Sequence, residues 1–282
     1  MGNVRSSIKR AARSLLSSPP VKRILYAPAV KKYLDHAPFA RKLYTVWDRM
    51  HPIDVQYGID TIGVLSAGEI SSDKKLIPQI TIYAGSQPSI VRTSISALGS
   101  IEDYTFIDFG CGKGRAMIVA TEFPFREVVG VDLSPALAAT ARVNAAKVAK
   151  QFPDRPRVTI AEANVIDFPL PSGKLAIFAY HPFGADVLAR IVRNLEAALA
   201  ADTPHVFFVY DFPVHSEILD ASPAFTRYYA QEIPYDKSEV GFGVFQHDAV
   251  VIWQSVRGAI PTPHHGVDRG IRIAEGKAAL VD

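Results

Sequence analysis

Hydrophobic positions in residues 101–256 form two alternating kinds of run. Short, nearly continuous apolar runs predict buried strands, and longer runs in which apolar residues recur every three or four positions predict helices. The predicted strands are 104–109, 127–132, 157–161, 174–180 and 205–210. The predicted helices are 114–123, 135–151 and 185–200, with a further helical stretch at 214–221. This alternation is typical of an α/β fold with a doubly wound, mostly parallel sheet.

The end of the chain departs from this alternation. Residues 228–233 and 249–253 read as two strands joined by a glycine-containing loop, which predicts an antiparallel hairpin at one edge of the sheet. Residues 257–282 contain prolines, histidines and glycines, and we expect a flexible tail with little packed structure. His264 and His265 have no third ligand nearby, so we read them as a solvated pair and predict no metal site.

Charge is distributed unevenly along the 282 residues. The net charge is +3, yet residues 1–50 hold eleven basic and two acidic residues, a charge of +9, which leaves −6 on the rest. The single cysteine, Cys111, excludes an internal disulfide and fits a reducing compartment. No apolar run is long enough to cross a membrane, so we expect a cytoplasmic protein.

Residues 1–44 are expected to form a basic helical extension, and three interpretations of it stay open. It is a basic arm that contacts an anionic membrane surface or nucleic acid, a targeting segment rich in Arg and Ser, or a helical extension that packs on the core. The first six residues also fit the short N-myristoylation pattern, which matters only in a eukaryote. The first interpretation would place the protein at the periphery of a membrane.

The most informative stretch is a glycine turn between the first predicted strand and helix. Gly110, Gly112 and Gly114 alternate with other residues, and Asp108 stands two positions before the first glycine. Glycine allows a tight turn and lets a ligand approach main-chain N–H groups, because no Cβ stands in the way. A strand, a glycine turn and a helix hold a nucleotide-like ligand at the carboxyl end of a parallel sheet. A nicotinamide-binding domain and a turn that holds no nucleotide remain alternatives.

A second acid narrows the choice of ligand. Asp132 ends the next predicted strand, 22 residues after Gly110, and its carboxylate can accept two hydrogen bonds from ribose hydroxyl groups. The Gly-x-Gly-x-Gly spacing with both acids resembles motif I of the class I S-adenosylmethionine (SAM)-dependent methyltransferases. The resemblance covers about residues 45–256, implies a Rossmann-like seven-stranded sheet with a terminal antiparallel hairpin, and places the SAM-binding core at 101–256.

The resemblance also implies a set of cofactor-binding residues. In that family an acid at the position of Asp108 faces the cationic amino-acid end of SAM, and Asn164 stands where an acid or amide bonds the adenine amino group. Cys111 is read as a small residue beside the ligand rather than a nucleophile. The complete set is Asp108, Gly110, Cys111, Gly112, Gly114, Asp132, Leu133, Asn164 and Tyr180.

The end of the fourth predicted strand indicates the acceptor. His181, Pro182 and Phe183 resemble the Asn-Pro-Phe or Asn/Asp-Pro-x-aromatic runs of amine-directed methyltransferases, with histidine in place of the amide. An acceptor group and a carbonyl next to proline orient the N–H groups of the amine, and an aromatic ring favours the developing cation. His181 could accept a hydrogen bond or act as a base near pH 7, or it could be part of a plain turn.

Residues 45–100 are expected to form a cap or lid. The run at 55–61 resembles the segment before the core in uncharacterised bacterial methyltransferases, where a lid role is implied; a plain turn at Gly58 is the alternative. Residues 80–83 alternate like a short strand, and Pro88 opens a helix. Tyr83 is either a lining residue of the pocket or a core tyrosine.

We therefore expect a SAM-dependent methyltransferase that acts on a nitrogen, with a protein lysine favoured and no stable partner inferred. The alternatives are methylation of a nucleic-acid base or a small molecule, and a SAM-binding module without catalysis. A base methyltransferase would use the basic arm for phosphate contacts.

Overall fold

The computed structural model describes residues 50–282, apart from 74–76, 243–244, 263–266, 275–276 and 282. The basic extension at 1–44, its myristoylation pattern and the His264–His265 pair lie outside these residues. All elements described below belong to one compact unit, His51–Asp282, which includes residues 51–100 of the cap region and the end of the chain.

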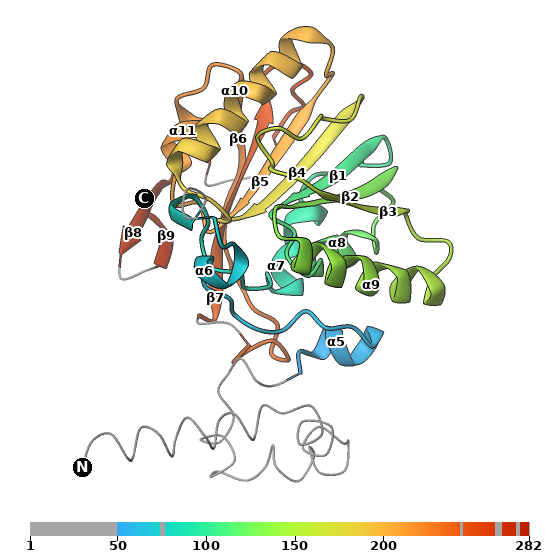
Figure 1. The fold of residues 1–282 in the computed structure, drawn as a ribbon. Coiled ribbons are helices and arrows are strands. Elements are labelled where there is room, and N and C mark those ends of the chain that lie inside the picture. The colour runs from blue at the N-terminus through green and yellow to red at the C-terminus, as the bar shows by residue number, and fades with distance from the viewer. Residues whose placement is uncertain (1–49, 74–76, 243–244, 263–266, 275–276, 282) are drawn as a thin grey trace, which may run out of the picture. The chain divides into compact units, whose positions relative to one another are not determined.

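A seven-stranded sheet organises this unit, in the order β3-β2-β1-β4-β5-β7-β6 (Figure 1). The first five strands are parallel, and β7 runs antiparallel to both β5 and β6. Their bounds are β1 Tyr104–Phe109, β2 Glu127–Asp132, β3 Val158–Glu162, β4 Lys174–Tyr180, β5 Val206–Asp211, β6 Phe225–Pro234 and β7 His247–Ser255. The Rossmann-like sheet with its terminal antiparallel hairpin is confirmed.

Helices cover both faces of this sheet. The helices of the described residues are α5 Pro52–Tyr57, α6 Ala67–Ile70, α7 Pro88–Ser96, α8 Arg115–Ala120, α9 Pro135–Gln151, α10 Ala185–Ala201 and α11 Ser216–Asp220, with a 3-10 turn η2 at Ile77–Gln79. Helix α9 begins as predicted, because the Ser134 side chain accepts from the Leu137 N–H and Pro135 occupies the first helical position.

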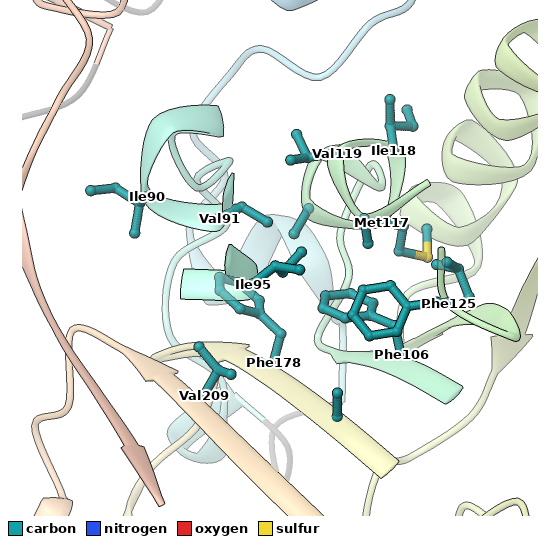
Figure 2. Close-up of a cluster of buried hydrophobic side chains, with 14 of the residues drawn as sticks. Ile90, Val91, Ile95, Phe106, Met117, Ile118, Val119, Phe125, Phe178 and Val209 are labelled. Atoms are coloured by element: carbon teal, nitrogen blue, oxygen red, sulfur yellow. The ribbon is translucent and has the colours of Figure 1, made fainter. Parts of the chain in front are cut away.

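Each face of the sheet contributes its own hydrophobic core. On one face, α7 and α8 pack over the middle strands; Figure 2 shows Ile95 and Met117 directed toward Phe106 and Phe178. On the other face, the apolar stripe of α10 covers β4 and β5. Because strand side chains alternate between faces, Asp108, Asp132, Tyr180 and Asp211 fall on the α7–α8 face.

The end of the chain corrects one expectation. In place of a flexible tail over 257–282, β8 Gly270–Ala274 and β9 Lys277–Val281 form an antiparallel pair. Leu280 is buried in the α10-side core, and its N–H donates to Glu232 of β6 at 2.9 Å. The Pro- and His-rich run before the hairpin masked this short apolar alternation.

The cap region also differs from its prediction in one place. Residues 80–83 form no strand; they make two isolated antiparallel bridges, Leu65 with Tyr83 and Ile80 with Phe183. Helix α7 begins at Pro88 as predicted. The Ile80–Phe183 bridge joins the cap to the loop after β4, and the Leu65–Tyr83 bridge lies within the cap.

Candidate functional site

The glycine turn has the conformation that its spacing predicts. Gly110, Gly112 and Gly114 all have positive φ angles, of 76°, 55° and 89°, a region that other L-residues rarely adopt. The N–H groups of Gly110 and Cys111 both donate to the carbonyl oxygen of Val131, which ties the turn to β2. Gly114 then begins α8 as its N-terminal flanking residue.

Asp132 braces this turn. Its two carboxylate oxygens accept hydrogen bonds from the N–H of Gly112 at 2.7 Å and from the N–H of Ser134 at 2.8 Å. Burial raises the pKa of Asp132, and these two N–H donors oppose the rise. Each oxygen keeps a second lone pair, so the carboxylate can still accept from a ligand. The brace is a structural role that the sequence pattern did not indicate.

Asp108 has a different environment. It is buried, and its carboxyl group makes no hydrogen bond with the side chains or N–H groups of the described residues. Burial and the nearby charge of Asp132 raise the pKa of Asp108 to about 8. The carboxyl group of Asp108 is therefore largely protonated at pH 7. A cationic ligand beside it would favour the ionised form.

A pocket opens above these residues, with about 960 Å³ of space counted out to its solvent-facing mouth. The predicted residues that line it are Asp108, Gly110, Cys111, Gly112, Asp132, Leu133, Asn164, Tyr180, Pro182 and Phe183. Gly114 and His181 are the two predicted residues that do not line it.

The lining fits SAM. The unpaired Asp108 carboxyl group suits an ammonium group, and the glycine turn leaves main-chain atoms accessible at the pocket wall. Asp132 is in place to accept from ribose hydroxyl groups. Burial, with Asp108 and Asp132 nearby, raises the pKa of Cys111 well above its usual value, so the thiol stays protonated, as expected for a small neighbour of the ligand.

Asn164 takes a local role as well. Its side-chain oxygen accepts from the N–H of Ile166 at 3.1 Å, which forms a turn after β3. The residue still lines the pocket, so its amide group can also meet a ligand.

The cap is fastened to the glycine turn by a buried arginine. Arg115, 5% exposed, donates from Nε to the hydroxyl oxygen of Thr61, from Nη2 to the carbonyl of Thr61 and from Nη1 to the carbonyl of Gly85, at 2.7, 2.8 and 2.9 Å. Thr61 in turn donates from its N–H and hydroxyl to Asp54. The sequence pattern did not predict this network, although a basic residue directly after the last glycine is a visible signal.

Residues 55–61 therefore serve as a strap in this structure. Gly58 ends α5 with a φ of 66°, and the Asp60 backbone pairs with the Asn144 side chain of α9. None of residues 55–61 lines the pocket, whereas residues 79–86 do. Tyr83 is both buried and a lining residue, with its hydroxyl bonded to the Thr61 carbonyl at 2.9 Å.

The loop after β4 closes the other end of the pocket. The Thr81 hydroxyl donates to the carbonyl of His181 at 2.6 Å, and the Thr81 N–H donates to the carbonyl of Pro182 at 3.3 Å. A Cβ atom on Gly110 would lie 2.6 Å from the Cβ of Pro182, so the loop sits directly against the glycine turn. Pro182 and Phe183 are thus held in the pocket wall by the cap.

The His181 ring points away from the predicted position. Its Nδ1 lies 3.1 Å from the hydroxyl of Tyr210, and the ring packs near Phe212 and His215. Burial, followed by the nearby His215, lowers the pKa of His181 to about 4, so the ring is neutral at pH 7. The backbone φ is 36°, a left-handed value that Asn, Asp and His tolerate better than most residues. The Asn-to-His exchange is therefore compatible with the backbone.

Within the part of the chain that the structure describes, no group of three or more His, Cys, Asp or Glu residues could hold a metal ion. Among the same residues, no helix is both long and apolar enough to cross a membrane.

Comparison with known proteins agrees with this geometry. Residues 106–202 match the family described as "Methyltransferase domain". A geranyl diphosphate 2-C-methyltransferase from Streptomyces ambofaciens is 28% identical over 123 residues, which cover 43% of this chain and 40% of that relative's length.

Solved structures of methyltransferases also resemble this chain, with low sequence identity to it. TrmN from Thermus thermophilus is 18% identical, with a TM-score of 0.43, over 60% of this chain and 49% of its own. A geranyl diphosphate C-methyltransferase from Streptomyces coelicolor A3(2), in complex with Mg²⁺, geranyl diphosphate and S-adenosyl-L-homocysteine, is 16% identical, with a TM-score of 0.40, over 59% of this chain and 78% of its own.

The family match and the site together identify the domain. Residues 106–202 therefore carry a methyltransferase domain built around the β1 glycine turn, and the pocket above that turn fits SAM.

Proposed function

We propose that this protein transfers the methyl group of SAM to a nitrogen atom, and that the acceptor is the side chain of a protein lysine. The observation that carries the proposal is the composition of one pocket, in which the strand-end acids Asp108 and Asp132 share a wall with Tyr180, Pro182 and Phe183. SAM supplies an activated methyl group on a sulfonium, so the protein needs chiefly to align the acceptor and exclude water.

Each part of the wall has a task in this proposal. Asp108 and Asp132 hold the cofactor through its ammonium and ribose groups. The aromatic rings of Tyr180 and Phe183 give an apolar, electron-rich surface for an alkylamine that becomes more cationic as it is methylated. The cap residues 79–86 cover the acceptor end and keep water from the reacting atoms.

The charge of the lining argues against an anionic acceptor. The relative from Streptomyces ambofaciens is named for methylation of geranyl diphosphate, whose phosphate groups call for basic side chains or a metal. The charged residues that line this pocket are Asp108, Asp132 and Arg115, and Arg115 already donates to Thr61 and Gly85. A cationic or neutral acceptor suits this balance better than a diphosphate.

Incubation with methyl-labelled SAM and a cell lysate tests the proposal. We expect label in protein, released as methyl-lysine after hydrolysis. Label in nucleic acid or in small molecules would contradict the lysine assignment. SAM binding without transfer to any pool would contradict the catalytic function and support a binding module.

A further inference from the structure

Two buried carboxyl groups near the acceptor end of the pocket have oxygen atoms without hydrogen-bond partners among the described residues. Asp211 ends β5 and is 0% exposed, and neither of its carboxyl oxygens is bonded. Asp248, in β7, is 2% exposed and uses only Oδ2, which accepts from the Tyr235 hydroxyl at 2.8 Å. Unpaired buried polar groups are rare and unfavourable, and each calls for an explanation such as an absent ligand.

The two groups influence each other. Burial and the charge of Asp248 raise the pKa of Asp211 well above its usual value, while the Ser86 side chain and the Phe212 N–H, which lie nearby, oppose part of the rise. Burial also raises the pKa of Asp248 to about 6. Among the described residues, no basic side chain shifts the pKa of Asp211, whereas His247 lowers the pKa of Asp248 and Arg115 opposes the rise at Tyr180.

The pair lies directly behind the pocket wall. Asp211 is the register partner of Tyr180 on the neighbouring strand, and Tyr180 lines the pocket. Ser86, which lies near Asp211, also lines the pocket. In the strand order β2-β1-β4-β5-β7, this places the pair at the opposite end from Asp132.

Tyr180 presents a hydrogen-bonding group in front of the pair. Its hydroxyl makes no hydrogen bond with the residues that the structure describes, and burial, Asp248 and Asp211 raise its pKa well above the usual value. The phenol therefore stays protonated, and its oxygen keeps its capacity to accept a hydrogen bond.

We propose that Asp211 and Asp248, with the Tyr180 and Ser86 hydroxyl groups in front of them, form a binding site for the ammonium group of an aliphatic primary amine. The inference rests on the proposed function and specifies the protonated form in which its acceptor binds; the ammonium group passes one proton to the ionised carboxylate of the pair before its nitrogen takes the methyl group. An ammonium group has three donors; the two hydroxyl oxygens accept from it within the pocket, and the carboxyl pair supplies negative charge in a water-poor setting, where the attraction is strong.

Binding of n-butylammonium chloride to the full-length protein, saturated with S-adenosyl-L-homocysteine, tests the site by NMR titration. n-Butanol serves as the uncharged control ligand. The variants are Asp211→Asn, Asp248→Asn and Tyr180→Phe, with Asp186→Asn as the control, because Asp186 is exposed in the first turn of α10 and does not line the pocket. Affinity for S-adenosyl-L-homocysteine is measured in parallel to show that each variant is folded.

We expect the native protein and Asp186→Asn to bind n-butylammonium more tightly than n-butanol. Each aspartate variant should weaken ammonium binding by about 30-fold or more while leaving butanol binding unchanged. Tyr180→Phe should weaken ammonium binding by about tenfold. If Asp211→Asn fails to retain S-adenosyl-L-homocysteine, Asp248→Asn and Tyr180→Phe decide the matter.

Equal binding of the two ligands, or ammonium binding that survives Asp248→Asn and Tyr180→Phe, would overturn the ammonium site. If the protein methylates an amine but shows no such ammonium site, the proposed function is still supported. Conversely, ammonium binding that depends on the pair, in a protein that methylates no amine, would support the site and refute the nitrogen-directed function.

Discussion

The cofactor end and the acceptor end of the pocket obtain their geometry from different sources. At the cofactor end, Asp108, the glycine turn and Asp132 lie within 25 residues of sequence, and backbone hydrogen bonds fix them to one another. At the acceptor end, Tyr180, Asp211 and Asp248 come from three strands, and the cap residue Thr81 holds the loop beside them. The first end is a local motif, and the second depends on the whole fold.

This difference indicates which residues of the pocket can vary with substrate specificity. A turn that is braced by main-chain N–H groups tolerates few substitutions, since its φ angles require glycine. A wall assembled from separate strands can change one side chain at a time without disturbing the sheet.

The substitution Gly112→Val should abolish cofactor binding. A Cβ atom there would overlap the Tyr83 ring, and valine is strained at a φ of 55°. We expect SAM affinity to fall by more than about 100-fold in calorimetry. Gly68→Ala is the matched control, because a Cβ atom on Gly68 meets nothing within 4 Å. Normal SAM binding by Gly112→Val would show that the turn is not the binding element.

Loss of Arg115 should separate the cap from the turn. Arg115→Met removes the donors to Thr61 and Gly85 and leaves Asp54 without its nearby positive charge. We expect the free energy of unfolding in urea to fall by about 3 kcal/mol. Arg142→Met, which removes an exposed 3.7 Å ion pair with Glu162 and an exposed hydrogen bond to the Ile160 carbonyl, should change it by less than about 1 kcal/mol. Equal effects of the two variants would argue against the strap.

Asp132→Ala should weaken SAM binding by about 2–3 kcal/mol, or about 30- to 150-fold, because it removes ribose hydrogen bonds and the brace on Gly112. Glu162→Ala is the control, since Glu162 ends the neighbouring strand β3 but does not line the pocket. Calorimetry measures both variants. An unchanged affinity in Asp132→Ala would remove the ribose assignment.

SAM binding at pH 7 should release about one proton from Asp108. The folded pKa of about 8 lies above the ordinary value of 3.8, so the empty pocket holds this proton, and its contribution to stability is lost as the pH rises through 8. A cationic ligand favours the carboxylate and displaces the proton. Calorimetry in buffers of different ionisation enthalpy measures the release, and Asp108→Asn should release none from this position. Equal release by both proteins would contradict the assignment.

His181→Asn should have the smallest effect. Asparagine tolerates the positive φ of this position, and the ring that it replaces does not line the pocket. We expect kcat to fall by less than about tenfold and the pH–rate profile to keep its shape. If kcat of the variant no longer depends on pH near pH 7, whereas kcat of the native protein does, the result would instead support His181 as a base.

Short-range signals in the sequence explain which elements of the fold were predictable. The bounds of β1, β2 and α9 matched their predictions, because continuous apolar runs and the Ser134–Pro135 cap act over short distances. The β8–β9 hairpin and the bridges of residues 80–83 were not foreseen, because they depend on contacts with distant strands and loops.

The same reason applies to the site. Asp108, Gly112 and Asp132 belong to a motif with fixed spacing, and all three line the pocket. The direction of the His181 ring follows from Tyr210 and its neighbours, which lie about 30 residues away in sequence. Asp211 and Asp248 stand alone in sequence, and only the pairing of β5 with β7 brings them together.

A crystal structure of the protein with S-adenosyl-L-homocysteine tests directly where the cofactor lies. We predict that the ligand lies across the ends of β1 and β2, with its ribose hydroxyl groups bonded to Asp132 and its amino group beside Asp108. A ligand bound elsewhere, or one whose ribose makes no contact with Asp132, would contradict the account.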